Sequence, residues 1–81
     1  MFYVYFLKST VNGHIYVGSC EDIQKRLLRH NAGQVKSTKA YKPWILLGYG
    51  VVATRSEAMA KEKFYKTGQQ KELLKMKYAN V

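Results

Sequence analysis

The sequence predicts an α+β fold in which a three-stranded antiparallel sheet is flanked by helices, in the order β-β-α-β-α-α. Three observations support this class: three segments rich in β-branched and aromatic residues, a turn signal between the first two, and helix-capping patterns after the second and third. The 81 residues suffice for one small domain, spanning residues 1–81. An apolar fraction of 47% is enough for a core and argues against disorder.

The three strands are expected at residues 2–8, 14–20 and 44–54. The first two flank Asn12-Gly13, a pair that is frequent in hairpin turns. The third contains two glycines, which predict a bend or a β-bulge. Between the second and third strands, residues 34–42 are expected to form a polar, basic loop that the only proline closes.

Three helices follow from capping patterns and apolar periodicity. Residues 19–22, Ser-Cys-Glu-Asp, resemble a capping box with Asp in place of Glu, and predict a helix to about Asn31. An Ala-Gly pair is expected to end it, because glycine readily adopts the left-handed cap conformation. Residues 54–57 form a second capping box, for a helix to about Thr67. A glycine then separates this helix from a basic third helix at residues 69–78.

The charge balance indicates a polyanionic partner. Fourteen Lys and Arg against five Asp and Glu give a net charge of +9, concentrated on the predicted helices and the loop at residues 34–42. Nucleic acid is the commonest polyanion, although a charge that merely maintains solubility is the alternative. No apolar run approaches the roughly 20 residues that span a bilayer, and residues 2–7 are too short for a signal peptide. We therefore expect a soluble cytoplasmic protein, in which the single Cys20 excludes a disulfide framework or a multi-cysteine zinc site.

Two tyrosines of the predicted hairpin are candidates for a shared site. Tyr5 and Tyr16 are separated by an odd number of residues, which places both side chains on one face of an antiparallel pair with an even-length loop. A two-residue turn at residues 12–13 would pair Tyr5 with Cys20 and leave Tyr16 about 13 Å away. A four-residue loop at residues 9–12 would pair the tyrosines directly. A shared site predicts the wider loop, whereas cross-strand packing is the simpler explanation of the pair.

The first predicted helix carries Arg26 and His30 on one stripe, at positions i and i+4. Arg26 could hold a phosphate bidentately, but it also follows Asp22 by four residues, so an exposed ion pair is the alternative. His30 could equally be a capping or surface histidine.

Glu62 is the most informative acid of the chain. On the second predicted helix it shares a stripe with Ala58, Tyr65 and Lys66, so an acid interrupts a face that should point inward. A buried carboxylate is costly unless it is paired or binds a cation. The alternatives are a salt bridge to Arg26 or to a lysine, or a rotated helix that leaves Glu62 in solvent. Because no second acid lies near it, a metal here would be one hard cation held by one carboxylate and waters.

Taken together, these residues resemble the signature of the GIY-YIG endonuclease domain, in its small stand-alone bacterial form, the YhbQ/YazA-like (UPF0213-type) group. Residues 3–5 (Tyr-Val-Tyr) and 16–18 (Tyr-Val-Gly) stand where that family has its two triplets. Residues 36–44 resemble the loop of the stand-alone group, and the match covers nearly the whole chain. The three single positions of the signature are Arg26, His30 and Glu62.

The resemblance implies metal-dependent hydrolysis of phosphodiester bonds in nucleic acid, with DNA and its repair as the expected setting. It implies that Tyr5 is the general base, that Tyr16 positions the water or the phosphate, and that Arg26 stabilises charge on the phosphoryl oxygens. His30 would orient Tyr5 or bind phosphate, and Glu62 would hold one Mg²⁺ or Mn²⁺ ion. The nucleic-acid contacts we expect are Lys36, Lys39, Lys42, Arg29 and Lys66.

Two other functions remain open at this point. The same fold and basic surface could form a nucleic-acid-binding module with little or no catalysis, or a protein-interaction domain whose charge only maintains solubility. A protein partner that supplies specificity, and the oligomeric state, are also left open by the sequence.

Overall fold

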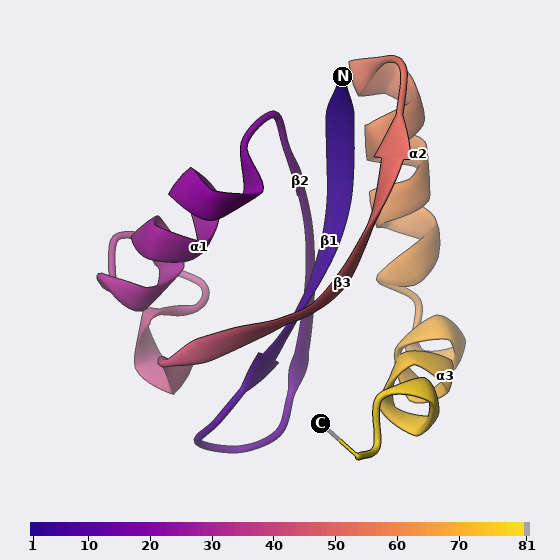
Figure 1. Ribbon diagram of the computed structural model, residues 1–81. Helices are drawn as coiled ribbons and strands as arrows, with labels where there is room; N and C mark the ends of the chain where they lie inside the picture. The colour runs from indigo at the N-terminus through magenta and orange to yellow at the C-terminus, as the bar shows by residue number, and fades with distance from the viewer. Residues whose placement is uncertain (81) are drawn as a thin grey trace.

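A computed structural model describes residues 1–80 (Figure 1). The sheet has three antiparallel strands in the order β2-β1-β3, and the sequence order β-β-α-β-α-α is as predicted. None of the helices in this part of the chain is long and apolar enough to cross a membrane. The elements are β1 (Phe2–Ser9), β2 (Ile15–Cys20), α1 (Ile23–Asn31), a short 3₁₀ helix (Lys39–Tyr41), β3 (Trp44–Val52), α2 (Arg55–Tyr65) and α3 (Gly68–Lys77).

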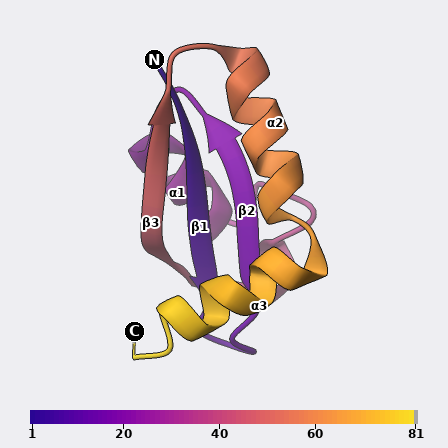
Figure 2. The same ribbon diagram turned by 90° about the vertical axis from the view of Figure 1, so that its right-hand side faces the viewer.

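Helices cover both faces of the sheet: α1 lies against one face, and α2 and α3 lie against the other (Figures 1 and 2). The central strand β1 is therefore buried on both sides, and its side chains alternate between two cores. The face under α2 and α3 is packed with apolar side chains, including Val4, Phe6 and Leu74. The face under α1 is built on Tyr5, Leu7 and Trp44. We call these the apolar face and the tyrosine face.

The register of the hairpin differs from both expected alternatives. Tyr5 pairs with Gly18, and Leu7 pairs with Tyr16. The backbone closes with a hydrogen bond from Ser9 N to His14 O at 2.9 Å, so the loop has the wider, four-residue length but begins one residue later than expected, at residue 10. Tyr5 and Tyr16 nevertheless lie on one face, as predicted, as diagonal neighbours with ring centroids 6.3 Å apart.

The β-bulge predicted in the third strand is confirmed. Phe6 pairs with Gly48 and Leu7 pairs with Leu46, so Leu47 is the extra residue. Gly48 also allows a close approach, because a Cβ atom there would lie 2.5 Å from the hydroxyl oxygen of Tyr78. The bulge therefore lies where the C-terminal end of α3 packs onto the sheet.

The helix starts were only partly predicted. Asp22, not Ser19, caps α1, because its side chain accepts a hydrogen bond from Lys25 N at 3.1 Å. Ser19 is a residue of β2. The cap at Thr54 is confirmed by a 3.1 Å bond from Glu57 N. The break expected at Gly68 is different in detail: α2 ends at Tyr65, and Gly68 is already the first residue of α3.

Candidate active site

The tyrosine face brings the two tyrosines and His30 together at its centre. Tyr5 is 2% exposed, and its ring lies over Gly18 of the neighbouring strand. A Cβ atom at Gly18 would lie 2.5 Å from the Tyr5 hydroxyl oxygen and 3.0 Å from the ring of Tyr16. The glycine therefore leaves the space in which the two phenol rings converge. The Tyr16 ring centroid lies 5.0 Å from that of the His30 imidazole.

A chain of hydrogen bonds runs inward from the Tyr5 hydroxyl. Its oxygen lies 3.0 Å from His30 Nε2, and His30 Nδ1 lies 2.7 Å from Thr38 Oγ1. Thr38 in turn donates to the carbonyl of Val35 at 3.4 Å. His30 and Thr38 are almost completely buried, so the surface and capping interpretations of His30 are wrong.

Burial is the main reason that both titratable groups of this hydrogen-bonded series, Tyr5 and His30, are neutral. Burial, with the charges of Arg26 and Arg29, lowers the pKa of His30 below its ordinary value. Burial also raises the pKa of Tyr5 well above that of a free phenol, and the neighbouring Tyr16 adds to this, while the charge of Arg26 acts in the opposite direction. At neutral pH the pair is therefore a phenol beside an uncharged imidazole.

The direction of each hydrogen bond in this series follows from the partners that each group has. If Tyr5 donates to His30 Nε2, then the Nδ1 hydrogen of His30 donates to Thr38 and the Thr38 hydroxyl donates to Val35. The polar hydrogens of Tyr5, His30 and Thr38 then all have an acceptor. The opposite tautomer leaves the buried Tyr5 hydrogen without an acceptor among these groups, so we assign the first arrangement.

The loop before β3 holds Thr38 in place. The Trp44 indole nitrogen donates to Thr38 O at 2.9 Å. The side chain of Asn31, at the end of α1, bonds both the N and the O of Trp44, at 2.6 and 3.1 Å. The loop thus presents one buried hydroxyl to His30, while the predicted contacts Lys36, Lys39 and Lys42 are exposed.

Sequence reasoning missed these supporting residues. Thr38 stands in a basic loop with no periodicity, and Asn31 only marked the expected end of a helix. Trp44 served merely as the start of a strand. The sequence signal for them is weak. A loop of this length needs side-chain partners for its buried backbone groups, and an Asn and a Trp at its ends can supply them.

Glu62 reaches the site from α2, on the other side of strand β2. Its Oε1 accepts a hydrogen bond from Ser19 Oγ at 2.6 Å, and its Oε2 lies 2.8 Å from Lys66 Nζ. Lys66 also lies over the Tyr16 ring, 5.9 Å from the centroid, and so links Glu62 to the tyrosine face. The site therefore straddles β2, and the salt bridge to a lysine foreseen as an alternative for Glu62 is present.

The Glu62 carboxylate is only partly shielded, with 26% of its side chain exposed. Burial acts to raise its pKa, but the hydrogen bonds from Lys66 and Ser19, with the charges of Lys66 and Arg26, outweigh burial and lower the pKa. Glu62 is thus ionised at neutral pH, as a metal ligand must be.

The donor set suits a magnesium-type ion but not a closed metal cage. Among residues 1–80 there is no group of three or more His, Cys, Asp or Glu side chains that could hold a metal. Mg²⁺ commonly binds through one or two carboxylates, with waters and substrate phosphate completing its coordination. One ionised carboxylate beside a basic site matches that pattern, with the Lys66 ammonium occupying one of its oxygens.

Comparison with known proteins assigns the chain to a family. The model of the GIY-YIG catalytic domain matches residues 1–79, and the chain belongs to the GIY-YIG family. It is 37% identical to a UPF0213 protein of Staphylococcus saprophyticus, over 91% of this chain and 90% of that protein. It is 41% identical to a UPF0213 protein of Bacillus pumilus, over 85% of this chain and 70% of that protein. No solved structure matches the chain.

Proposed function

We propose that this protein is a metal-dependent phosphodiesterase that cuts nucleic acid, with DNA as its substrate. The observation that carries the proposal is the buried Tyr5 hydroxyl, 3.0 Å from an uncharged His30. A phenol and an imidazole in contact can move a proton between them, which is the property that a general base needs. Membership of the family supports a nuclease-type function in general terms.

In this proposal Tyr5 accepts a proton from the attacking water while its own proton passes to His30 Nε2. This route is needed because the pKa of Tyr5 is raised, so the phenol is not ionised in advance. The water oxygen forms a bond to phosphorus, and the bond to the leaving oxygen breaks. The leaving oxygen takes up a proton from solvent. Afterwards the imidazolium of His30 returns its proton through Tyr5 to solvent.

The remaining residues handle charge on the phosphate. Arg26 lies beside Tyr5 and stabilises the phosphoryl oxygens, while Tyr16 positions the phosphate or the water. Glu62 would hold one Mg²⁺ or Mn²⁺ ion, which when bound neutralises charge at the leaving oxygen. Lys66 would release Glu62 to the ion and turn toward phosphate, and Lys36, Lys39, Lys42 and Arg29 would contact the backbone of the strand.

A second candidate is a nucleic-acid-binding module with little catalysis. The observation in its favour is that Glu62 is already neutralised by Lys66 at 2.8 Å and so has no electrostatic need of a metal. Under this alternative the basic surface binds phosphate and the Tyr5–His30 pair serves only to pack the core. A protein partner could then supply its specificity.

The two functions are separated by cleavage of supercoiled plasmid and of a branched DNA in Mg²⁺, Mn²⁺ or EDTA. We compare wild type with Glu62→Gln and with Glu57→Gln, a matched change in the helix cap of α2. The phosphodiesterase predicts metal-dependent cleavage that Glu62→Gln abolishes and Glu57→Gln retains. Binding without cleavage in any metal would favour the module. Cleavage that Glu62→Gln leaves intact would refute the metal role of Glu62.

A further inference from the structure

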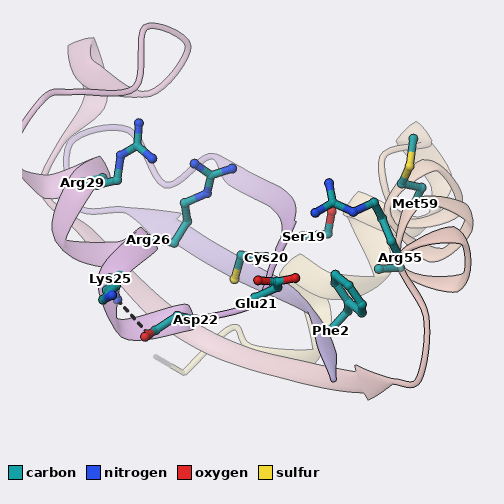
Figure 3. Close-up of a pocket in the computed structure, with 11 residues that line it drawn as sticks. Phe2, Ser19, Cys20, Glu21, Asp22, Lys25, Arg26, Arg29, Arg55 and Met59 are labelled. Carbon is teal, nitrogen blue, oxygen red and sulfur yellow. Dashed lines mark hydrogen bonds between the residues drawn. The ribbon is translucent and has the colours of Figure 1, made fainter.

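A cleft of about 340 Å³ opens beside the site, between α1 and the first turn of α2 (Figure 3). The end of strand β2, at Ser19 and Cys20, lies between its two walls. Arg26 and Arg29 project from α1 on one side, and Arg55 stands on α2 on the other. Because Arg26 belongs both to the cleft and to the surroundings of Tyr5, the cleft adjoins the candidate active site.

The cleft gathers positive charge that the protein does not neutralise. Among the described residues the ion pairs are Lys66–Glu62 and Lys75–Glu72, so none of the cleft's four cations has a carboxylate oxygen within 4.0 Å. Two acids, Glu21 and Asp22, also line the cleft, so the basic side chains outnumber the acidic ones by four to two. The cations therefore stay in excess, and their mutual repulsion is relieved when an anion enters. The four cations are Lys25, Arg26, Arg29 and Arg55.

Arg55 lies two helical turns before Glu62 on α2. The two residues are seven apart on α2, two helical turns, so they share one side of the helix with about 10.5 Å of rise between them. The Arg55 guanidinium lies over the Phe2 ring, 5.5 Å from its centroid, which restrains the side chain against the wall. One strand of stacked DNA rises about 3.4 Å per phosphate, so this distance corresponds to about three nucleotides.

We propose that the cleft binds the phosphate backbone of the strand being cut, between Arg29 on one wall and Arg55 on the other, with Arg55 about three nucleotides from the scissile bond. The inference rests on the proposed function for the position of that bond, and it adds Arg55 to the residues that the sequence suggested. Contacts of this kind are made to phosphates and not to bases, so we expect the cleft to bind DNA without preference for its base sequence.

The test measures binding without cleavage. Fluorescence anisotropy of a labelled single-stranded DNA in EDTA compares wild type, Arg55→Gln and Lys63→Gln, which removes an exposed charge from the same helix outside the cleft. We expect Arg55→Gln to weaken binding by about tenfold and to reduce the slope of log affinity against log salt by about 1. We expect Lys63→Gln to leave both nearly unchanged. Circular dichroism establishes that all three proteins are folded.

A length series locates the contact. When the DNA is shortened so that fewer than about three nucleotides extend past the cleaved bond toward Arg55, the penalty of Arg55→Gln should disappear. An equal loss in Lys63→Gln, or no loss in Arg55→Gln, would overturn the inference. If the protein cleaves DNA but its affinity does not depend on Arg55, the proposed function is supported and the role of the cleft in binding DNA is contradicted. If binding depends on Arg55 but no DNA is cleaved, the role of the cleft in binding DNA is supported and the proposed hydrolysis is not. If the protein does not bind DNA, both proposals are contradicted.

Discussion

The two faces of strand β1 differ in what their packing achieves. On the apolar face Val4 and Phe6 contact other apolar side chains of α2, α3 and the neighbouring strands. On the tyrosine face Tyr5 is equally buried, yet its hydroxyl enters a chain of polar groups that ends at Thr38. Burying a polar group costs free energy of folding unless the group is hydrogen-bonded, and an apolar core would avoid this requirement. Under the proposed function, the apolar face stabilises the fold and the tyrosine face carries the chemistry.

The largest expected effect comes from breaking the polar chain at its centre. His30→Leu removes the acceptor for the proton of Tyr5, so we expect cleavage to fall by about 10²- to 10⁴-fold. Leaving the buried Tyr5 hydroxyl without a partner should also cost about 1–3 kcal/mol of unfolding free energy. Single-turnover cleavage and urea denaturation measure the two. Full activity in a folded variant would show that the chain is only structural.

The apolar face should respond in the opposite manner. Leu74→Ala removes a side chain that is 6% exposed and packs against that face, so we expect a loss of about 2–5 kcal/mol in stability. Below the melting transition the cleavage rate per folded molecule should stay close to that of wild type. A rate that falls as far as in His30→Leu would contradict the division between the two faces.

Gly18→Ala tests the space between the tyrosines. The added Cβ would meet the Tyr5 hydroxyl at 2.5 Å and the Tyr16 ring at 3.0 Å, so both rings must move. We expect a destabilisation of about 1–3 kcal/mol together with a large loss of cleavage. Gly50→Ala is the control, since nothing lies within 4 Å of a Cβ built there and its φ is not positive. Equal activity in both variants would show that the position of Tyr5 does not matter.

The hydroxyl of Thr38 can be removed with little change in the shape of the side chain. Thr38→Val should destabilise the protein by about 1–3 kcal/mol, since His30 Nδ1 loses its acceptor, and should alter the pH dependence of cleavage. Thr38→Ser keeps the hydroxyl and should retain the wild-type pH profile. A merely structural role would predict that the two variants differ in stability alone.

The smallest effect concerns the pair between Glu62 and Lys66. The pKa of Glu62 is lowered in the folded protein. The pair therefore stabilises the folded protein at pH values above the pKa of an unfolded glutamate, about 4.3. This contribution is lost as the pH falls through the lowered pKa of the folded state. The groups are partly exposed, which limits the contribution to about 1 kcal/mol or less. Unfolding of wild type and Glu62→Gln between pH 7 and pH 2 should reveal it. A difference that grows on acidification would contradict the sign.

The sequence was most informative where one local rule decides the outcome. Alternation along β1 and β2 placed Tyr5 and Tyr16 on one face, and the capping box at Thr54 placed the start of α2. It was less informative where two rules compete. Asp22 and Ser19 both carry capping side chains, and the register of the hairpin decided between them by extending β2 to Cys20.

The polar chain itself lay beyond sequence reasoning in part. His30 was identified as a candidate, but its burial depends on how α1 packs against the sheet, which no local pattern reports. Thr38 comes from a loop fixed by Asn31 and Trp44, two contacts between distant segments. The Lys66 partner of Glu62 could be anticipated only as one of several lysines, because helical spacing permits an i, i+4 pair without requiring it.

The most direct test of the central claim compares two tyrosines of one triplet. Tyr5→Phe and Tyr3→Phe each remove one hydroxyl from β1, but Tyr3 packs on the ring of Tyr49 and lies outside the polar chain. In single-turnover cleavage of DNA with Mg²⁺, we predict that Tyr5→Phe loses about 10²- to 10⁴-fold in rate and that Tyr3→Phe stays within about twofold of wild type. Equal rates in the two variants would contradict a chemical role for the tyrosine face.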